Sequence, residues 1–344
     1  MANVLLILDR SSAAEQLGDL VVQEIGETRI EVIDFSGDLP SFLAGVRRIR
    51  GLISDFKPDF VHFQEAVSVP ATILAFLPWQ LPMTLTVHDP LPHTGEDGMS
   101  LSSLKRRFVL DRWRRRCDAA VTHGVALVKA LQDLYPRLDG LVFSVPHGPL
   151  GGPPVATAPI AGTFLFFGRI HAYKGLGFFV SAVRSLHERG LPVRAVIAGR
   201  GEDLQRHRAL IDGHPAFELH ERYIAPDELP GLFARAQAVV LPYTDGTQSG
   251  VAAMALGFGR AIIATRVGAL QEMVRDGDNG LLVDPRDAEA LAAAMARMIA
   301  APDLAVRMGR RSAELGRTEL SWERNAQITL RAYESAVRHK RGRS

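Results

Sequence analysis

The chain has 344 residues, which is long enough for two domains that each bury their own core. Hydrophobic residues make up 47% and charged residues 23%, an ordinary globular composition that excludes disordered and fibrous proteins. The net charge of +2 argues against nucleic-acid binding over a broad surface, and the single cysteine, Cys117, excludes an intramolecular disulfide and a cysteine-based zinc site.

The sequence has no segment typical of export or of a membrane span. Its first apolar run, residues 4–8, is far shorter than the roughly 20 residues that a span needs, and no basic segment precedes it. We therefore expect a cytoplasmic protein.

Short apolar runs alternate with longer amphipathic segments, which is the pattern of parallel sheets wrapped by helices. The strands predicted in the first half are 4–8, 30–35, 60–63, 84–87, 119–122 and 141–145. The strands predicted in the second half are 163–167, 193–198, 217–219, 238–241, 261–265 and 280–283. The pattern therefore occurs twice.

These repeats predict an α/β protein of two Rossmann-like domains. The first domain covers residues 1–148, the linker 149–161 is rich in Pro and Gly, and the second domain covers 162–320. The last segment, 321–344, opens with a Ser cap and predicts a helix with a basic tail. Ligands of such sheets bind outside the carboxyl ends of the strands, so we expect the site in a cleft between the domains.

Two glycine-bearing turns in the second half point to a phosphorylated ligand. Gly168 lets the backbone approach a ligand, while Arg169 and Lys174 supply positive charge for a diphosphate. Two surface cations beside a turn are the alternative. Gly199 and Gly201 follow the next predicted strand, but the full six-position dinucleotide fingerprint is absent, which argues against an NAD site.

A third segment, 241–251, joins a predicted strand to a predicted helix through Thr247, Gln248, Ser249 and Gly250. Free backbone N–H groups at the start of a helix suit a phosphate. An ordinary loop capped by Thr247 or Ser249 is the alternative.

Taken in chain order, these segments resemble a known family. The segments are Gly168-Arg169…Lys174-Gly175, Gly199-x-Gly201, Leu241-Pro242-Tyr243…Thr247-Gln248-Ser249-Gly250-Val251 and 264–272. Together they resemble the donor domain of family 4 (group 1) glycosyltransferases, which are retaining enzymes of the GT-B fold. Ser321-Trp322-Glu323 is similar to the start of the helix that crosses back to the N-terminal domain in this family.

The resemblance implies that a sugar is transferred with retention from a nucleotide-diphosphate sugar, which is a co-substrate, to a glycan, a lipid-linked molecule or a small molecule. It implies a hexosyltransferase of polysaccharide or glycoconjugate biosynthesis that needs neither a cofactor nor a metal ion. The catalytic residues that it implies are His88, Arg169 and Lys174. The donor-binding residues are Gly168, Gly199, Gly201, Tyr223, Asp245, Gly246, Thr247, Gln248, Ser249, Gly250, Val251 and Glu272. The acceptor-side residues are Asp9, Arg10 and Asp89. For His88, a purely structural histidine at a strand end is the alternative.

One departure from the family is large. The two glutamates that the family places in the donor loop fall on Gly246 and Met254, neither of which carries a carboxylate. The loop resembles instead a branch that reads Thr-Gln-Ser-Gly-Val, in which Asp245 is the nearest carboxylate to the sugar and Met254 is expected to face the core. The missing glutamates leave two alternatives open: a catalytically silent nucleotide-sugar-binding subunit of a glycan-assembly system, and a GT-B nucleotide-sugar 2-epimerase.

Residues 105–116 contain seven cations interleaved with Phe108, Leu110 and Trp113. Such a segment could rest on an anionic membrane surface, which would bring the protein to the inner face of the membrane and suit a lipid-linked acceptor. A solvated helix with its apolar residues packed inward is the alternative. Nothing else in the sequence supports binding of nucleic acid.

Overall fold

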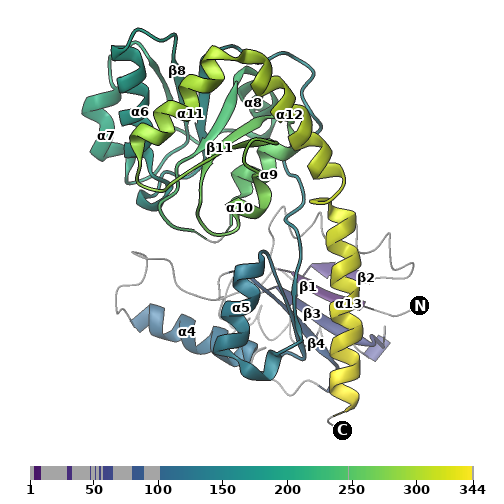
Figure 1. The fold of residues 1–344 in the computed structure, drawn as a ribbon. Helices are drawn as coiled ribbons and strands as arrows, with labels where there is room; N and C mark the ends of the chain where they lie inside the picture. Colours follow the sequence, from purple (N-terminus) through teal and green to yellow (C-terminus); the bar gives the residue numbers. More distant parts are fainter. Residues whose placement is uncertain are drawn as a thin grey trace. The chain divides into compact units, whose positions relative to one another are not determined.

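The computed structural model describes residues 4–8, 29–32, 47, 51, 54–55, 57–64, 80–88, 101–246 and 248–342. The chain divides into two compact units: Met1–Pro146 with Trp322–Ser344, called unit 1 here, and His147–Ser321, called unit 2 (Figure 1). Four of the predicted site residues lie outside the described residues: Asp9, Arg10, Asp89 and Thr247.

Unit 1 is built on a parallel sheet with the strand order β2-β1-β3-β4-β5-β6. Its strands are β1 (Val4–Leu8), β2 (Arg29–Val32), β3 (Phe60–Gln64), β4 (Met83–Val87), β5 (Ala119–Thr122) and β6 (Val142–Ser144). Its named helices are α4 (Leu101–Arg114), α5 (Val125–Leu134), η1 (Pro136–Leu138) and α13 (Trp322–Arg341). The strand order reverses between β1 and β3.

Helix α4 contains most of the basic segment 105–116, and its apolar residues point in different directions. Trp113 is buried, and its ring lies 4.5 Å from that of Phe63 in the core of unit 1. Phe108, in contrast, is 64% exposed. Inward packing of Trp113 agrees with the solvated-helix alternative, and association with a membrane surface stays a prediction. Within the described ranges, no helix is both long enough and apolar enough to cross a bilayer.

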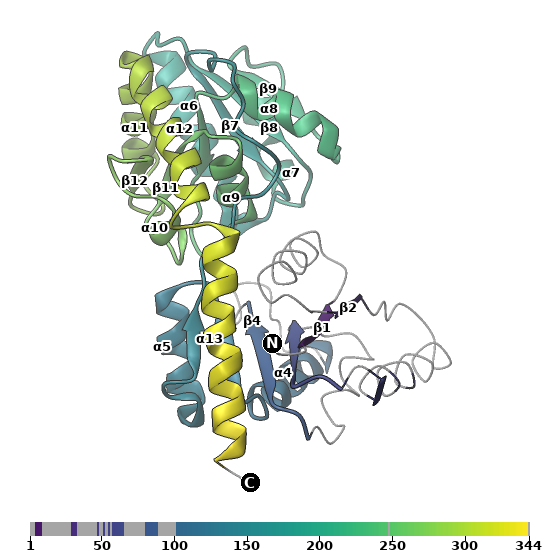
Figure 2. The same ribbon diagram turned by 90° about the vertical axis from the view of Figure 1, so that its right-hand side faces the viewer.

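The C-terminal helix α13 packs against the sheet of unit 1, as Figure 2 shows. Ala332 and Ala336 meet Ala119 and Val121 of β5, and their small side chains allow the helix to approach the strands closely. Hydrophobic burial of this face holds the helix against β5, which lies about 200 residues earlier in the sequence.

A buried polar network fixes the register of α13 on β3 and β4. His62 Nδ1 lies 2.7 Å from the Tyr333 hydroxyl, and His62 Nε2 lies 2.8 Å from Thr86 Oγ1. Burial lowers the pKa of His62 to about 3, so the ring is neutral and each nitrogen has one partner. Near the start of the helix, Asn325 Nδ2 donates to the Pro146 carbonyl over 2.9 Å.

Unit 2 is built on a second parallel sheet, with the order β12-β11-β10-β7-β8-β9. Its strands are β7 (Thr163–Phe167), β8 (Arg194–Ala198), β9 (Phe217–His220), β10 (Ala238–Leu241), β11 (Ala261–Thr265) and β12 (Gly280–Val283). Its helices are η2 (Ala172–Lys174), α6 (Leu176–Glu188), α7 (Leu204–Ile211), η3 (Pro226–Glu228), α8 (Leu229–Arg235), α9 (Gly250–Gly257), α10 (Leu270–Met273), α11 (Ala288–Ala300) and α12 (Pro302–Arg317).

Alternate residues of the buried strands supply two cores, one on each face of this sheet. In β7, Phe164 and Phe166 join the core under α6 and α11, whereas Leu165 joins the core under α8 and α9. Both faces are therefore covered. The predicted α/β fold class is confirmed, and each predicted strand overlaps an observed one, although β2 and β4 each begin one residue before the predicted start.

We expect Tyr333→Phe to lower the free energy of unfolding by about 1–3 kcal/mol, because His62 Nδ1 would stay buried and lose its partner. Urea denaturation followed by circular dichroism measures the change. Glu334→Gln on the exposed side of the same helix is the control and should leave the midpoint unchanged. Equal midpoints for the two variants would contradict the prediction.

Candidate functional site

The three predicted ligand loops of unit 2 follow neighbouring strands. They come after β8, β7 and β10, which lie side by side in this order in the sheet. The strand order reverses between β7 and β10, and ligands of open α/β sheets bind outside the carboxyl ends of the strands at such a point. The sheet topology therefore gathers these loops at the edge where a ligand is expected.

The loops after β7 and β8 touch through their glycines. Gly168 has a φ of 104° and Gly199 a φ of 143°, conformations that other residues rarely adopt. A Cβ atom on Gly199 would lie 1.9 Å from the Gly168 carbonyl oxygen, and one on Gly201 would lie 2.2 Å from that of Ile170. Only glycine permits this close approach, so the predicted glycines hold the two loops together.

The loops after β7 and β10 are joined by Tyr173 and Tyr243. The backbone N–H of Thr244 donates to the Tyr173 carbonyl over 2.7 Å. The two tyrosine rings meet edge to face, with centroids 6.0 Å apart. Thr265 Oγ1, at the end of β11, donates to the Tyr243 carbonyl over 2.6 Å. These contacts attach the β7 loop to the β10 loop, and the β10 loop to the sheet.

Lys174 lies half-buried among these loops, with its Nζ 5.6 Å from the centroid of the Tyr243 ring. Its ammonium group would also lie 3.4 Å from a Cβ on Gly168. Burial, and next the positive charge of Arg169, lower the pKa of Lys174 to about 8. No carboxylate of the described residues offsets these two effects. The site thus keeps a concentrated positive charge that a bound anion would stabilise.

Helix α9 begins beside this cation. The buried Ser249 is its N-cap: Ser249 Oγ accepts a hydrogen bond from the Ala252 N–H over 3.1 Å and lies 3.1 Å from the Tyr243 hydroxyl. Val251 Cγ2 would lie 3.4 Å from a Cβ on Gly168, so the start of the helix adjoins the β7 loop. Because the Ser249 hydroxyl caps the helix, a phosphate here would rest mainly on the backbone amides of Gly250 and Val251.

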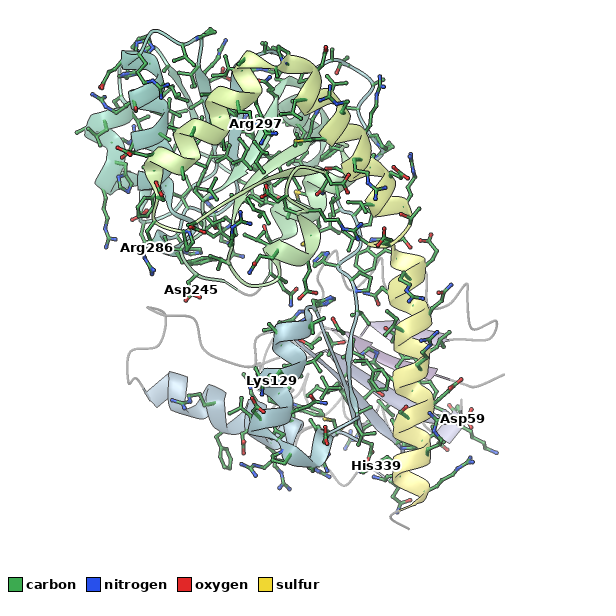
Figure 3. All side chains as sticks on the ribbon, in the orientation of Figure 1. Asp59, Lys129, Asp245, Arg286, Arg297 and His339 are labelled. Carbon is green, nitrogen blue, oxygen red and sulfur yellow. The ribbon has the colours of Figure 1, made fainter. Side chains whose placement is uncertain are left out.

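The sugar end of the predicted site is less enclosed. Asp245 Oδ1 accepts a hydrogen bond from the Gly246 N–H over 2.8 Å, and Figure 3 shows this side chain at the rim of unit 2. Gly246 has a φ of 140°, where a glutamate would be strained, and Met254 packs partly buried against the core below α9. The local fold therefore accommodates the absence of both family glutamates.

The remaining predicted donor residues lie at the surface of unit 2. Tyr223 is 68% exposed in the loop after β9, the strand next to β8. Gln248 is half-buried in the β10 loop, and Glu272 is exposed in α10. The structure brings Tyr223 to the same sheet edge as the glycine loops.

In unit 1, the described catalytic candidate is His88, which is exposed directly after β4. Its ring stacks on that of His123, with centroids 5.8 Å apart and an angle of 21° between the planes. His123 follows the neighbouring strand β5 and is 9% exposed. The sequence analysis does not predict this pair, although both residues directly follow adjacent predicted strands.

The sequence analysis also does not predict the contacts made by Tyr173 and Tyr243, or the hydrogen-bonded pair of His171 and Glu202. They stand inside or beside the quoted motifs, but only the contacts between loops reveal them.

Within the described part of the chain, no group of three or more His, Cys, Asp or Glu side chains is arranged to hold a metal ion.

Two family models match the chain, one in each half. The model for Glycosyltransferase Family 4 matches residues 4–148, and the model for Glycosyl transferases group 1 matches residues 161–301. The chain belongs to the family 4, group 1 glycosyltransferases. This glycosyltransferase is 29% identical over 323 residues to D-inositol 3-phosphate glycosyltransferase of Arthrobacter sp. (strain FB24), a match that covers 87% of this chain and 76% of the relative.

Solved structures show the fold that this family membership implies. Sucrose-phosphate synthase from Thermosynechococcus elongatus superposes with a TM-score of 0.71 at 17% identity, covering 97% of this chain and 98% of that one. HepE of Anabaena, in complex with UDP and glucose, gives a TM-score of 0.71 at 14% identity and covers 97% and 100% of the two chains. These likenesses establish the GT-B fold.

We expect Gly199→Ala to destabilise the protein by about 1–3 kcal/mol, since the new Cβ would collide with the Gly168 carbonyl in a strained backbone conformation. Thermal unfolding measures the effect. Gly231→Ala in α8 is the control, because its Cβ would meet no atom within 4 Å and alanine favours a helix. The prediction fails if the two variants melt at the same temperature.

Proposed function

We propose that this glycosyltransferase transfers a sugar, with retention of anomeric configuration, from a nucleoside-diphosphate sugar to a hydroxyl group of a glycan, a lipid-linked molecule or a small molecule. The observation that carries the proposal is the Lys174 ammonium: it is held half-buried beside Arg169, uncompensated by any described carboxylate, at the start of α9. Two cations and a helix N-terminus together match the charge of a diphosphate.

The positive charge would act on the leaving group. In the transfer, the bond between the anomeric carbon and the diphosphate oxygen breaks and its electron pair goes to the diphosphate. The acceptor oxygen bonds to the same face of the sugar, and its proton passes to the departing diphosphate. Lys174 and Arg169, already in place, stabilise the charge that develops on the diphosphate, so we propose that side-chain cations do the work that a metal ion does elsewhere.

The nucleotide class is supported by a structural neighbour, since the HepE structure contains UDP and glucose. UDP is therefore the first nucleotide to test here, with ADP and GDP beside it. From unit 1, we propose that His88 contacts the acceptor or the transferred sugar. A lipid-linked acceptor would give the exposed Phe108 and its neighbouring arginines a role at an anionic surface.

We expect binding of the nucleoside diphosphate to weaken as the pH rises above about 8, because Lys174 then loses the proton that pairs with the phosphate. One proton linked to binding gives a decline of up to about tenfold in affinity per pH unit. Calorimetric titration between pH 7 and 9.5 measures it. Lys174→Arg, which stays charged over this range, should abolish the decline, and a decline of equal size in that variant would exclude Lys174 as its source.

We expect one or more of UDP-, ADP- and GDP-sugars to raise the melting temperature, because a ligand that binds only the native state stabilises it. Wild-type protein should then release the nucleoside diphosphate by transfer or hydrolysis, and Lys174→Ala and His88→Ala should reduce this at least about tenfold, the loss expected for a charged hydrogen bond. Lys129→Ala, an exposed site on α5 labelled in Figure 3, is the control. Stabilisation without turnover would favour a silent binding subunit, and epimerised donor would favour a 2-epimerase.

A further inference from the structure

A pair of side chains joins the β7 and β8 loops in addition to the glycine contacts. His171 Nδ1 lies 2.9 Å from Glu202 Oε1, a hydrogen-bond distance. His171 stands three residues before Lys174, and Glu202 directly follows Gly201. The Glu202 side chain is 64% exposed, and an exposed pair of this kind contributes little to overall stability. The His171–Glu202 pair therefore matters mainly for the local arrangement of the two loops that it joins.

The pair continues into the aromatic contacts under Lys174. The His171 ring stacks on Tyr173, with centroids 5.9 Å apart and planes 12° from parallel. Tyr173 in turn meets Tyr243 edge to face, and the Lys174 ammonium lies over the Tyr243 ring. One continuous row of contacts therefore runs from Glu202, in the β8 loop, through the β7 loop to the ring in the β10 loop that adjoins the ammonium.

The segment that carries Lys174 needs such a restraint. Lys174 ends η2, a single turn of 3-10 helix, and His171 at the N-cap makes no side-chain capping bond. Short 3-10 turns have poor hydrogen-bond geometry and hold their shape weakly. Because burial beside Arg169 disfavours the charged ammonium, a loose loop would relax by moving Lys174 out into water.

We propose that His171 and Glu202 are positioning residues, whose hydrogen bond between the β7 and β8 loops holds the Lys174 ammonium in place over Tyr243 before a diphosphate arrives. Their role deepens the proposed function and rests on it, because it explains how a site for the diphosphate is kept ready. A competing explanation is that Glu202 acts only as a negative charge near an anion site. Removing the carboxylate should weaken binding of a diphosphate if Glu202 positions Lys174, and should strengthen it if Glu202 acts only as a negative charge.

The first measurement needs no ligand. The chain has five lysines: Lys57, Lys105, Lys129, Lys174 and Lys340. With so few, the ¹³Cε resonance of Lys174 can be followed by NMR and assigned from its absence in the spectrum of Lys174→Arg. In the wild type this resonance should titrate near pH 8. In Glu202→Ala and His171→Phe we expect the midpoint to move upward toward the ordinary lysine value as the ammonium leaves its place.

The groups around Lys174 do not confuse this readout. Burial raises the pKa of Tyr243, so that ring stays neutral near pH 8. Hydrogen bonding to His171 lowers the pKa of Glu202, which is therefore fully ionised there. A midpoint that stays at its wild-type value in both variants overturns the proposal.

The second measurement is the affinity for UDP, with ADP and GDP in parallel. Loss of the hydrogen bond in Glu202→Ala or His171→Phe should weaken binding by about 3- to 10-fold, the size expected for one net hydrogen bond. The double variant should bind no more weakly than either single one, because both remove the same contact. Stronger binding by Glu202→Ala would favour the charge explanation and overturn ours.

Conservative variants separate the hydrogen bond from the other properties of the pair. Glu202→Gln keeps an acceptor oxygen, and His171→Asn keeps a donor near the position of Nδ1, so each should retain most of the wild-type affinity and titration midpoint. Glu188→Ala removes a carboxylate of similar exposure, 67%, that pairs with Arg184 on α6, and should change neither. If no nucleotide binds the wild type, the proposed function fails, while the ligand-free titration still decides whether His171 and Glu202 hold Lys174.

Discussion

A lysine ammonium partly removed from water, beside a second cation and with no described carboxylate to balance it, is the constraint on which the candidate site in unit 2 depends. Such a group costs free energy in the ligand-free state. Around the Lys174 side chain lie two glycine loops in backbone contact, the ring of Tyr243 and the start of a helix. A bound diphosphate would turn this cost into binding free energy.

The sheet topology makes this arrangement possible. Loops 168–175, 199–203 and 242–249 come from parts of the sequence that are tens of residues apart, yet β8, β7 and β10 are neighbours in unit 2. The loop after β8 allows close backbone approach, the loop after β7 supplies positive charge, and the loop after β10 leads into the helix amides. Because the strands are buried on both faces, the loop ends are anchored in a rigid core.

The donor loop departs from its family at the positions where it would contact sugar and ribose. Gly246 adopts a backbone conformation that disfavours any side chain, and Met254 packs against the core. A glutamate could not simply be restored at residue 246, so the departure is part of the local fold and not an isolated substitution. The glycines and cations expected to bind the diphosphate are present, whereas neither position expected to carry a sugar- or ribose-binding glutamate has one.

Much of the fold could be predicted from the sequence, because buried parallel strands are continuous apolar runs, and the glycines and cations that follow them stand at fixed short spacings. Gly168, Lys174 and Gly199 can therefore be identified from the sequence. The His171–Glu202 bond, the Tyr173–Tyr243 contact and the stacking of His88 on His123 cannot, because each joins residues from different loops. Local sequence determined which residues follow each strand, and only the order of strands in the sheets, set by burial of both faces, decided which of them meet.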